Sequence, residues 1–364
     1  MNQTQTTNWS LFKILCRILG GQDNHTLADS ISAGLLPQLL DMARVHDVLP
    51  ALAVRHNERF NASGSMKSRE GEILAQALRK NTLRNMKISA QALKLTRTLN
   101  KAGITPLFLK GTVQLLEEDA ADLGFRQQVD IDFVVERAQL ESASDALLAE
   151  GYRFYQLPHG ANRKPTPVID TRAAAKLGAI HHHLPPLVKD GYDTTVELHS
   201  HFLPKRFQDD NPLSPLFATA MLRENRSARF LIPSTEQRII QLILGKLVND
   251  GHLARRTFPL REACDFINLL NSAKSGIDQT MIEMRCGKKF ALFYQLVVEF
   301  MAYTPGISID ASQDISSYIQ IMRRRHDSAA LRTVLDTYAR AQHLTSQLTH
   351  NPEKLPAYLR RLAG

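Results

Sequence analysis

The segment from Leu107 to Val135 constrains the fold more than any other, because two acids are set into a strand-like apolar run. Asp130 and Asp132 alternate there with apolar residues, and every second residue of a strand projects to the same face of a sheet. Two carboxylates side by side at a buried strand repel each other and are costly to remove from water. A divalent cation would offset that cost, so the segment predicts a site for Mg²⁺ and phosphate. The competing interpretation, an exposed strand edge with two solvated acids, fits the strongly apolar flanks less well.

A Gly–Thr pair closes the strand-like run about one helix length before the two acids. Gly111 permits a tight turn and the close approach of a bulky anion. A helix that begins at Thr112 would offer unpaired backbone N–H groups to phosphate oxygens, with Lys110 and the Thr112 hydroxyl beside them. Strand–glycine–helix turns are also common as purely structural elements, so the pair indicates phosphate binding only together with the acids that follow it.

Glu197 offers a third carboxylate, in the strand-like segment 194–202. By the same alternation it shares a face with His199 and His201. If this strand lies beside the first, three acids meet, and such a site can hold two Mg²⁺ ions that clamp a triphosphate and activate an attacking hydroxyl. Arg126, just upstream of the two aspartates, would neutralise a carboxylate or a phosphate.

The periodicity of the chain predicts an α+β protein, in which a small mixed β-sheet core is flanked by N- and C-terminal helical regions. Apolar residues recur with helical spacing before residue 103 and again from residue 213. Between them, short apolar runs alternate with one amphipathic helix and several turn signals. The predicted regions are 1–103 (helical), 104–208 (α/β core) and 209–364 (helical). The predicted strands are 104–110, 129–135, 152–157, 180–184 and 194–199, and the predicted helices of the core are 112–120 and 138–150.

Composition indicates the general class of the protein but does not identify its ligand. The chain has 364 residues, a formal net charge of +9 and three widely spaced cysteines. The positive charge favours anionic partners in general, and the odd number of cysteines favours a reducing cytoplasm over a disulfide framework. The longest apolar run, Phe290 to Tyr303, contains two polar residues and is too short to span a bilayer. We therefore expect a cytoplasmic protein without a membrane span.

Four motifs, in a fixed order along the chain, are similar to those of a known family. They are LKG at Leu109–Gly111, Arg126 four residues before DID at Asp130–Asp132, GY at Gly151–Tyr152, and VELH at Val196–His199. By these motifs the chain resembles the nucleotidyltransferase superfamily with the polymerase-β-like fold. Within it, the chain resembles the bacterial family of uncharacterised nucleotidyltransferases, type five, over most of residues 35–205. That family often ends the last motif with tryptophan, where this chain has Ser200.

The resemblance implies a role for each motif residue. Phosphate-binding residues would lie at the turn and just before the second strand: Lys110, Gly111, Thr112 and Arg126. Catalytic and metal-binding acids would lie on the two strands: Asp130, Asp132 and Glu197. Glu197 would bind metal or take the proton of the acceptor. The implied cofactor is Mg²⁺ or Mn²⁺, and the implied substrate is a nucleoside triphosphate (NTP).

Three functions fit these expectations. The first is a metal-dependent nucleotidyltransferase that moves a nucleoside monophosphate (NMP) from an NTP to an acceptor hydroxyl and releases pyrophosphate. A small molecule, a protein side chain and the 3′ end of an RNA are all compatible acceptors. The second is a catalytically silent nucleotide-binding or protein-interaction module of the same fold, against which the presence of all three acids argues. The third is a helical scaffold whose sheet domain is incidental.

Three further features have two interpretations each. The segment 159–176 is either a mobile lid or a disordered insertion. In the run His181–His183, the first and third residues would share a strand face and, with His199, could bind zinc, although spacing alone does not show the closed geometry that zinc needs. Arg323–Arg325 would grip nucleic-acid phosphates or, as we prefer, form a solvated helix face.

Overall fold

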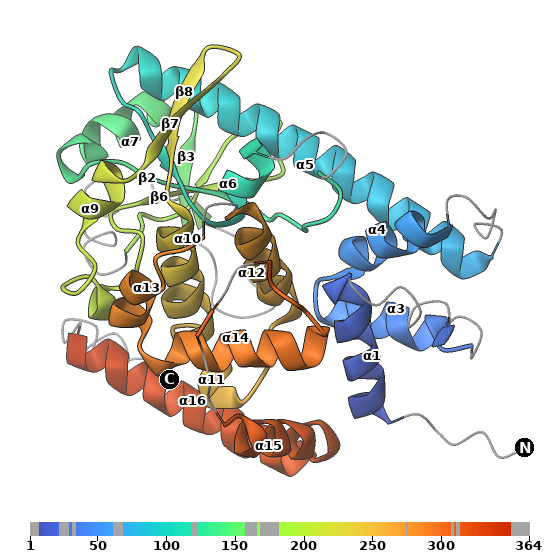
Figure 1. The fold of residues 1–364 in the computed structure, drawn as a ribbon. Helices are drawn as coiled ribbons and strands as arrows, with labels where there is room; N and C mark the ends of the chain where they lie inside the picture. Colours follow the sequence, from blue (N-terminus) through green and yellow to red (C-terminus); the bar gives the residue numbers. More distant parts are fainter. Residues whose placement is uncertain are drawn as a thin grey trace, which may run out of the picture. The chain divides into compact units, whose positions relative to one another are not determined.

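The fold is known from a computed structural model, in which the chain combines many helices with a mixed β-sheet in an α+β architecture (Figure 1). This confirms the predicted fold class. The chain forms two compact units, and each unit is built from three segments that are separate in the sequence. The sheet unit contains Asn85–Asp119, Gln128–Gln241 and His343–Gly364, and the helical unit contains Met1–Arg84, Ala120–Gln127 and Leu242–Gln342. The structure describes residues 7–21, 29–30, 34–60, 68–117, 123–156, 166–167, 182–273, 276–306, 309–310 and 314–350.

The helical unit is built on amphipathic helices whose apolar faces meet. In α1, the Thr7 hydroxyl caps the first turn by accepting the Ser10 N–H at 3.2 Å, and Gly21 ends the helix in the left-handed region at φ 76°. Trp9 and Phe12 of this helix pack their rings against Phe300 of α14. The helices are α1 (Asn8–Gly20), α3 (Leu36–Val45), α4 (Leu49–Phe60), the start of α5 (Arg69–Lys101), the π-helix η4 (Leu242–Val248), α11 (His252–Arg255), α12 (Leu260–Ser272), α13 (Gln279–Cys286), α14 (Lys288–Met301), α15 (Ser316–Asp327) and most of α16 (Ala329–His350).

The sheet unit contains one mixed sheet with the strand order β4-β3-β5-β6-β2-β1-β8-β7. The pairs β2·β6 and β1·β8 are parallel, and the other neighbours are antiparallel. Because β2 and β6 are central and parallel, their corresponding residues lie side by side in the middle of the sheet. The strands are β1 (Leu107–Phe108), β2 (Asp130–Val134), β3 (Arg153–Gln156), β4 (Thr166–Pro167), β5 (Leu187–Val188), β6 (Thr195–His199), β7 (Met221–Asn225) and β8 (Ala228–Ile232).

Helices and aromatic side chains hold this sheet in place. Phe108 packs edge-to-face on Phe133 and Phe230, with ring centroids 6.2 and 5.6 Å apart, so three neighbouring strands share one apolar layer. Asn100 at the end of α5 bonds the backbone N–H and C=O of Arg229 at 2.8 and 2.9 Å, which ties that helix to β8. The other helical elements of the unit are α6 (Lys110–Glu117), η2 (Arg137–Gln139), α7 (Leu140–Ala149), η3 (Lys205–Phe207), α9 (Leu213–Ala218) and α10 (Thr235–Gln241).

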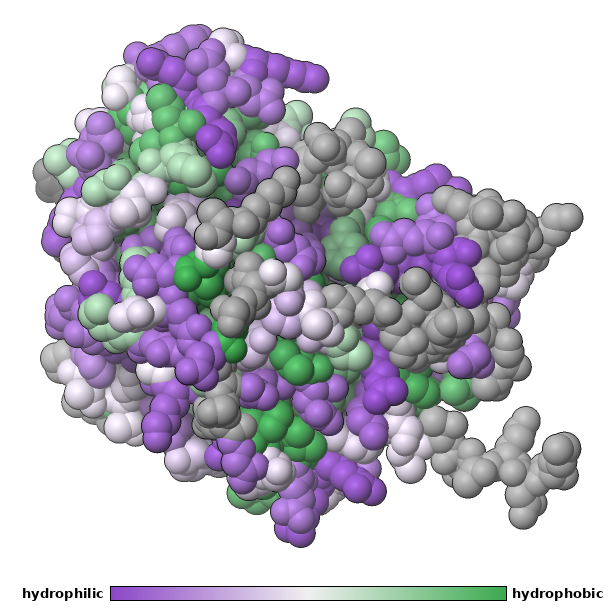
Figure 2. Space-filling view, viewed as in Figure 1, coloured by the Kyte–Doolittle hydropathy of each residue, from purple (hydrophilic) through white to green (hydrophobic). Residues whose placement is uncertain are grey.

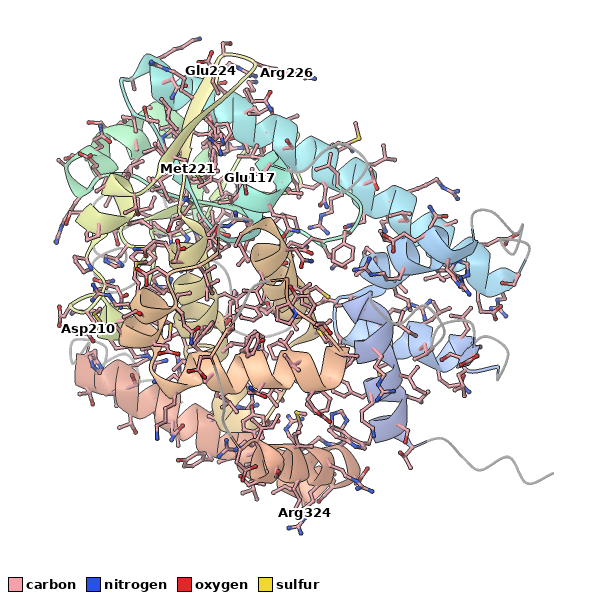
Figure 3. All side chains as sticks on the ribbon, viewed as in Figure 1. Glu117, Asp210, Met221, Glu224, Arg226 and Arg324 are labelled. Atoms are coloured by element: carbon pink, nitrogen blue, oxygen red, sulfur yellow. The ribbon has the colours of Figure 1, made fainter. Side chains whose placement is uncertain are left out.

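Most predicted elements of the core are present, but the sheet extends beyond residue 208. The hairpin β7–β8 adds two strands from the segment that the sequence analysis assigned to a helical region, and there the assignment was wrong. The hairpin turns at Arg226 and Ser227, which are both at positive φ (48° and 60°). Asn-Gly is the usual sequence at such a turn, because these two residues tolerate positive φ. Figure 3 shows Glu224 and Arg226 at its tip, and hydrophilic residues cover this end of the unit in Figure 2. The limits of the three predicted regions otherwise stay a prediction.

A second difference concerns the predicted strand 180–184. Residues 180 and 181 lie outside the described residues, and His183 forms an isolated antiparallel bridge with His199, outside the named strands. The next partner of β6 in the sheet is the short strand β5, which lies between the predicted strands 180–184 and 194–199. A two-residue strand carries too little alternation to be found from the sequence.

Two expectations from composition can be compared with the structure. The cysteines Cys16, Cys264 and Cys286 are buried, and their thiols are free. Along the parts of the chain that the structure describes, every helix is too short or too polar to cross a membrane.

Candidate active site

The register of the two central strands brings two acids together. Because β2 and β6 run parallel, Asp132 pairs with Glu197 directly across the sheet, and Asp130 pairs with Thr195. The side chain of Asp132 is fully buried, whereas that of Glu197 is 19% exposed. The neighbouring residues Ile131 and Phe133 are buried as well, so the strand lies within the core and not at a solvated edge.

His199, one strand repeat beyond Glu197, joins the two acids. Its Nε2 lies 2.9 Å from Oδ1 of Asp132 and 3.5 Å from Oε2 of Glu197, and its side chain is fully buried. Asp132, Glu197 and His199 each offer one ligand atom, and these atoms lie within 4.8 Å of one another. Oδ2 of Asp132 and Nδ1 of His199 are buried and have no hydrogen-bond partner among the described residues. A donor set of two oxygens and one nitrogen, with a buried unpartnered oxygen, fits a divalent cation.

Lys110 supplies a positive charge to the same group. Its Nζ lies 2.5 Å from Oδ1 of Asp132 and 3.8 Å from Oε2 of Glu197. The Leu109 N–H donates to the backbone oxygen of Asp132 at 3.0 Å, after which the chain turns directly into α6. Lys110 makes this turn at φ 54°, in the left-handed region that is unfavourable for a residue with a Cβ. Strained backbone of this kind persists where the surrounding contacts demand it.

The Gly–Thr pair that follows has a different place from the one the sequence predicted. Thr112 is buried, and its hydroxyl accepts the backbone N–H of Asp132 at 3.0 Å, so it holds the strand that carries the acid. Gly111 is the second residue of α6 and is buried, while the turn itself falls on Lys110. A phosphate-binding role for these two residues stays a prediction.

Two predicted residues remain, Asp130 and Arg126. Among the described residues, the close ligand group consists of Asp132, Glu197 and His199 and does not include Asp130. Asp130 is half-buried, and the amide Nε2 of Gln128 lies 3.5 Å from its Oδ1. Arg126 belongs to the helical unit, where its Nε donates to both oxygens of Asp265 at 2.9 and 3.0 Å. Arg126 is thus engaged with a carboxylate, one of the two partners predicted for it. The functional roles of both residues stay predictions.

The histidine run lies next to the group. The rings of His182, His183 and His199 have centroids 5.0–5.4 Å apart, and Nδ1 of His183 lies 2.8 Å from the backbone oxygen of Leu184. His181 lies outside the described residues, as does the segment 159–176 apart from β4. Of the histidines, His199 contributes to the close ligand group, and its partners there are carboxylates.

A comparison with known protein families gives a match that includes the sheet and the close acidic group. The family described as "Uncharacterised nucleotidyltransferase" matches residues 36–301, a range that contains every strand of the sheet and the close acidic group. The chain belongs to this nucleotidyltransferase family. The resemblance predicted from the four motifs is therefore confirmed. No match was found among curated proteins or among solved structures.

The charges of the close group and Lys110 support one another. Burial alone would raise the pKa of Asp132, but Lys110 and His199 outweigh it and hold that pKa well below its usual range. Burial would lower the pKa of Lys110, yet the nearby carboxylates raise it instead. The pKa of Glu197 is lowered, because its hydrogen bond to His199 and the charge of Lys110 overcome burial and the repulsion of Asp132. The acids are therefore ionised and Lys110 is charged at neutral pH.

Two residues beside the acids or Lys110 were not fully predicted from the sequence. His199 was given too little weight, and Gln241 was not found. His199 shares the alternation of Glu197, which was a usable signal, but its pairing with Asp132 depends on the parallel register. Gln241, which accepts the Lys110 N–H at 3.2 Å, is 131 residues away along the chain and had no signal in the sequence.

Proposed function

We propose that this family member is a divalent-metal-dependent nucleotidyltransferase that transfers an NMP from an NTP to an acceptor hydroxyl and releases pyrophosphate. The observation that carries the proposal is the register pair Asp132–Glu197, joined by His199 and faced by Lys110. If the cluster were purely structural, ionised acids would add little stability to the core. Burying each charge costs several kcal/mol, which is on the order of the attraction between the paired charges.

Asp132, Glu197 and His199 would hold the metal, either Mg²⁺ or Mn²⁺. Oδ2 of Asp132 is buried and has no hydrogen-bond partner within the described part of the chain. This supports the assignment, since such a carboxylate oxygen in a core calls for a cation or a donor. Asp130, on the same strand, is the further acid that the sequence motif assigns to the metal. When bound, a divalent cation supplies positive charge to the phosphate oxygens and promotes deprotonation of the acceptor hydroxyl.

The other steps fall to side chains of the protein. Lys110 is 23% exposed and would contact the triphosphate oxygens, on which negative charge develops during transfer. Glu197, also partly exposed, would take the proton of the acceptor. The acceptor oxygen then bonds to the α-phosphorus while the bond from this phosphorus to its bridging oxygen breaks, and pyrophosphate leaves. Thr112 would act indirectly, by holding the backbone of Asp132.

The proposal covers three acceptor classes: a small molecule, a protein side chain and an RNA 3′ end. It places the reaction in the cytoplasm, on the basis of the three free thiols. The test incubates the protein with each α-labelled NTP, with Mg²⁺ or Mn²⁺, in the presence of protein, RNA and small-molecule pools from cells. Pyrophosphate release is measured together with the mass of each labelled product, which identifies the acceptor.

Two variants make the test specific. Asp132→Asn keeps the shape of the side chain and should lower pyrophosphate release by about 100-fold or more. Asp190→Asn is the matched control, because Asp190 is 89% exposed and forms an ion pair with Arg153 on the surface of the same unit. Equal pyrophosphate release by wild type and Asp132→Asn would refute the proposal. Stabilisation by NTP and metal without any pyrophosphate would favour the silent nucleotide-binding module instead.

A further inference from the structure

The backbone of Lys110 needs support from outside its own turn. Lys110 begins α6 at φ 54°, and a residue with a Cβ leaves this conformation unless other contacts hold it. Its N–H also belongs to the first turn of a helix, where backbone donors have no partner within the helix. The direction of the Lys110 side chain, and so the place of its ammonium group beside Asp132, depends on this one strained residue.

Gln241 provides that support. Its Oε1 accepts the Lys110 N–H at 3.2 Å, and its Nε2 donates to the backbone oxygen of Phe202 at 3.0 Å. Phe202 follows the end of β6, the strand that carries Glu197. A single amide group thus joins the turn that bears Lys110 to the chain just beyond the strand that bears its second carboxylate partner.

The position of Gln241 suits this task. It is 5% exposed, so both hydrogen bonds are shielded from competing water. It is the last residue of α10, and the chain continues as the π-helix η4. Helices of this type are rare in proteins, and those that occur often lie at functional sites. A neutral side-chain amide carries a carbonyl oxygen that accepts and an NH₂ group that donates, so it can satisfy an N–H and a C=O at once.

The geometry points to Gln241 as a positioning residue of the nucleotidyl-transfer site, which acts through Lys110 by fixing its left-handed backbone and so directing its ammonium group at Asp132 and Glu197. The part that concerns catalysis rests on the proposed function. The part that concerns the placement of Lys110 does not, and it can be tested without any substrate.

The first experiment measures how well Lys110 is shielded from chemical modification. The full-length protein is acylated briefly with an amine reagent, and the labelling of Lys110 is read by peptide mass spectrometry relative to the exposed Lys94. Gln241→Met keeps the length of the side chain and removes both hydrogen bonds, so labelling of Lys110 should rise several-fold. Gln237→Met is the matched control, since it makes the same change one turn earlier on α10, at a residue that is also buried.

Each result of this experiment decides the matter. A selective rise of Lys110 labelling in Gln241→Met supports the inference, even if the protein transfers no nucleotide. Equal labelling in wild type and Gln241→Met overturns it, and so does an equal rise in Gln237→Met, which would indicate general loosening. If Gln241→Met does not fold, Gln241→Asn takes its place, because it keeps the amide but withdraws it by one methylene group.

The second experiment connects Gln241 to the reaction. In the wild-type background, Gln241→Met should lower kcat about 10-fold or more, with a smaller change in KM for the NTP. In a Lys110→Ala background the same substitution should have no further effect on kcat, because the group through which it acts is gone. An undiminished loss of kcat in that background overturns the positioning role, whereas absence of transfer in the wild type contradicts only the proposed function.

Discussion

The ammonium nitrogen of Lys110 lies 2.5 Å from Oδ1 of Asp132, a carboxylate that is fully buried in the sheet. A buried ion pair is costly to break from one side, because the remaining charge loses its partner but not its desolvation. Lys110→Met should therefore lower the free energy of unfolding by about 3 kcal/mol. Urea denaturation in the presence of a chelator measures this without a contribution from metal.

The exposed pair formed by Lys94 and Glu150 provides the control for this measurement. Its side chains are 50% and 35% exposed and its closest atoms are 3.8 Å apart. Surface pairs of this kind contribute at most about 1 kcal/mol, so Lys94→Met should be nearly neutral. Similar losses in the two variants would mean that Lys110 does not compensate a buried charge.

Substitution of His199 should weaken metal binding more than substitution of His201, two residues further on. Its Nε2 contacts both acids, so His199→Phe removes one donor of the ligand group while it keeps a ring in the core. We expect a 10- to 100-fold weaker affinity for Mn²⁺, as is typical when a ligand or its supporting partner is lost. Isothermal titration calorimetry with the metal alone measures the affinity.

His201→Phe is the matched control for the metal experiment. His201 lies two residues further on and its Nδ1 accepts the backbone N–H of Leu203 at 3.1 Å, so this change disturbs a local turn. It should alter stability and leave the affinity for Mn²⁺ within about two-fold of wild type. An unchanged affinity in His199→Phe would remove His199 from the metal site.

The sequence contained most of the site but not its assembly. The alternation of Asp130 with Asp132, and of Glu197 with His199, reports which residues share a strand face, because the strand period is 2. It does not report which strands are neighbours or whether they run parallel. Those facts decide that Asp132, and not Asp130, pairs with Glu197. Register is a tertiary property and depends on the whole sheet.

The fold beyond residue 208 shows the same limit. The helical spacing expected from residue 213 onward agrees with α12 and α14, since each of these helices buries a broad apolar stripe. The hairpin β7–β8 escaped prediction because β7 is exposed along its whole length and therefore shows no alternation. Its turn also lacks the glycine that would have marked it.

Thr112 offers a test of how the backbone supports the acid. Its hydroxyl accepts the N–H of Asp132 at 3.0 Å in the core, so Thr112→Val leaves that N–H buried without a partner. The expected loss of stability is about 1–3 kcal/mol, and kcat should fall as well because Asp132 is no longer fixed. Thr112→Ser keeps the hydroxyl and should retain most of kcat. Equal transfer rates for the valine and serine variants would show that this hydrogen bond does not matter for the site.

Acid should destabilise the helical unit through His46, whose ring lies 5.4 Å from that of Phe12. Burial, with a smaller contribution from the charge of His326, lowers the pKa of His46 to about 4, against about 6.5 in an unfolded chain. Between these values the unfolded chain binds a proton that the folded one does not, so stability is lost as the pH falls through this window. Allowing for the partial exposure of His46, the loss is about 2 kcal/mol.

The variant His46→Gln cannot take up this proton and should show the smaller change. Urea denaturation of wild type and variant at about pH 7.5 and about pH 4.5 gives four free energies of unfolding. The difference between the two pH values should shrink by about 2 kcal/mol in His46→Gln, because the unfolded variant no longer gains a proton at position 46. His326 packs against the same Phe12 ring and its pKa is also lowered by burial, so some acid sensitivity should persist in His46→Gln. An equal pH dependence in both proteins would mean that His46 is as accessible to protons in the folded state as in the unfolded one.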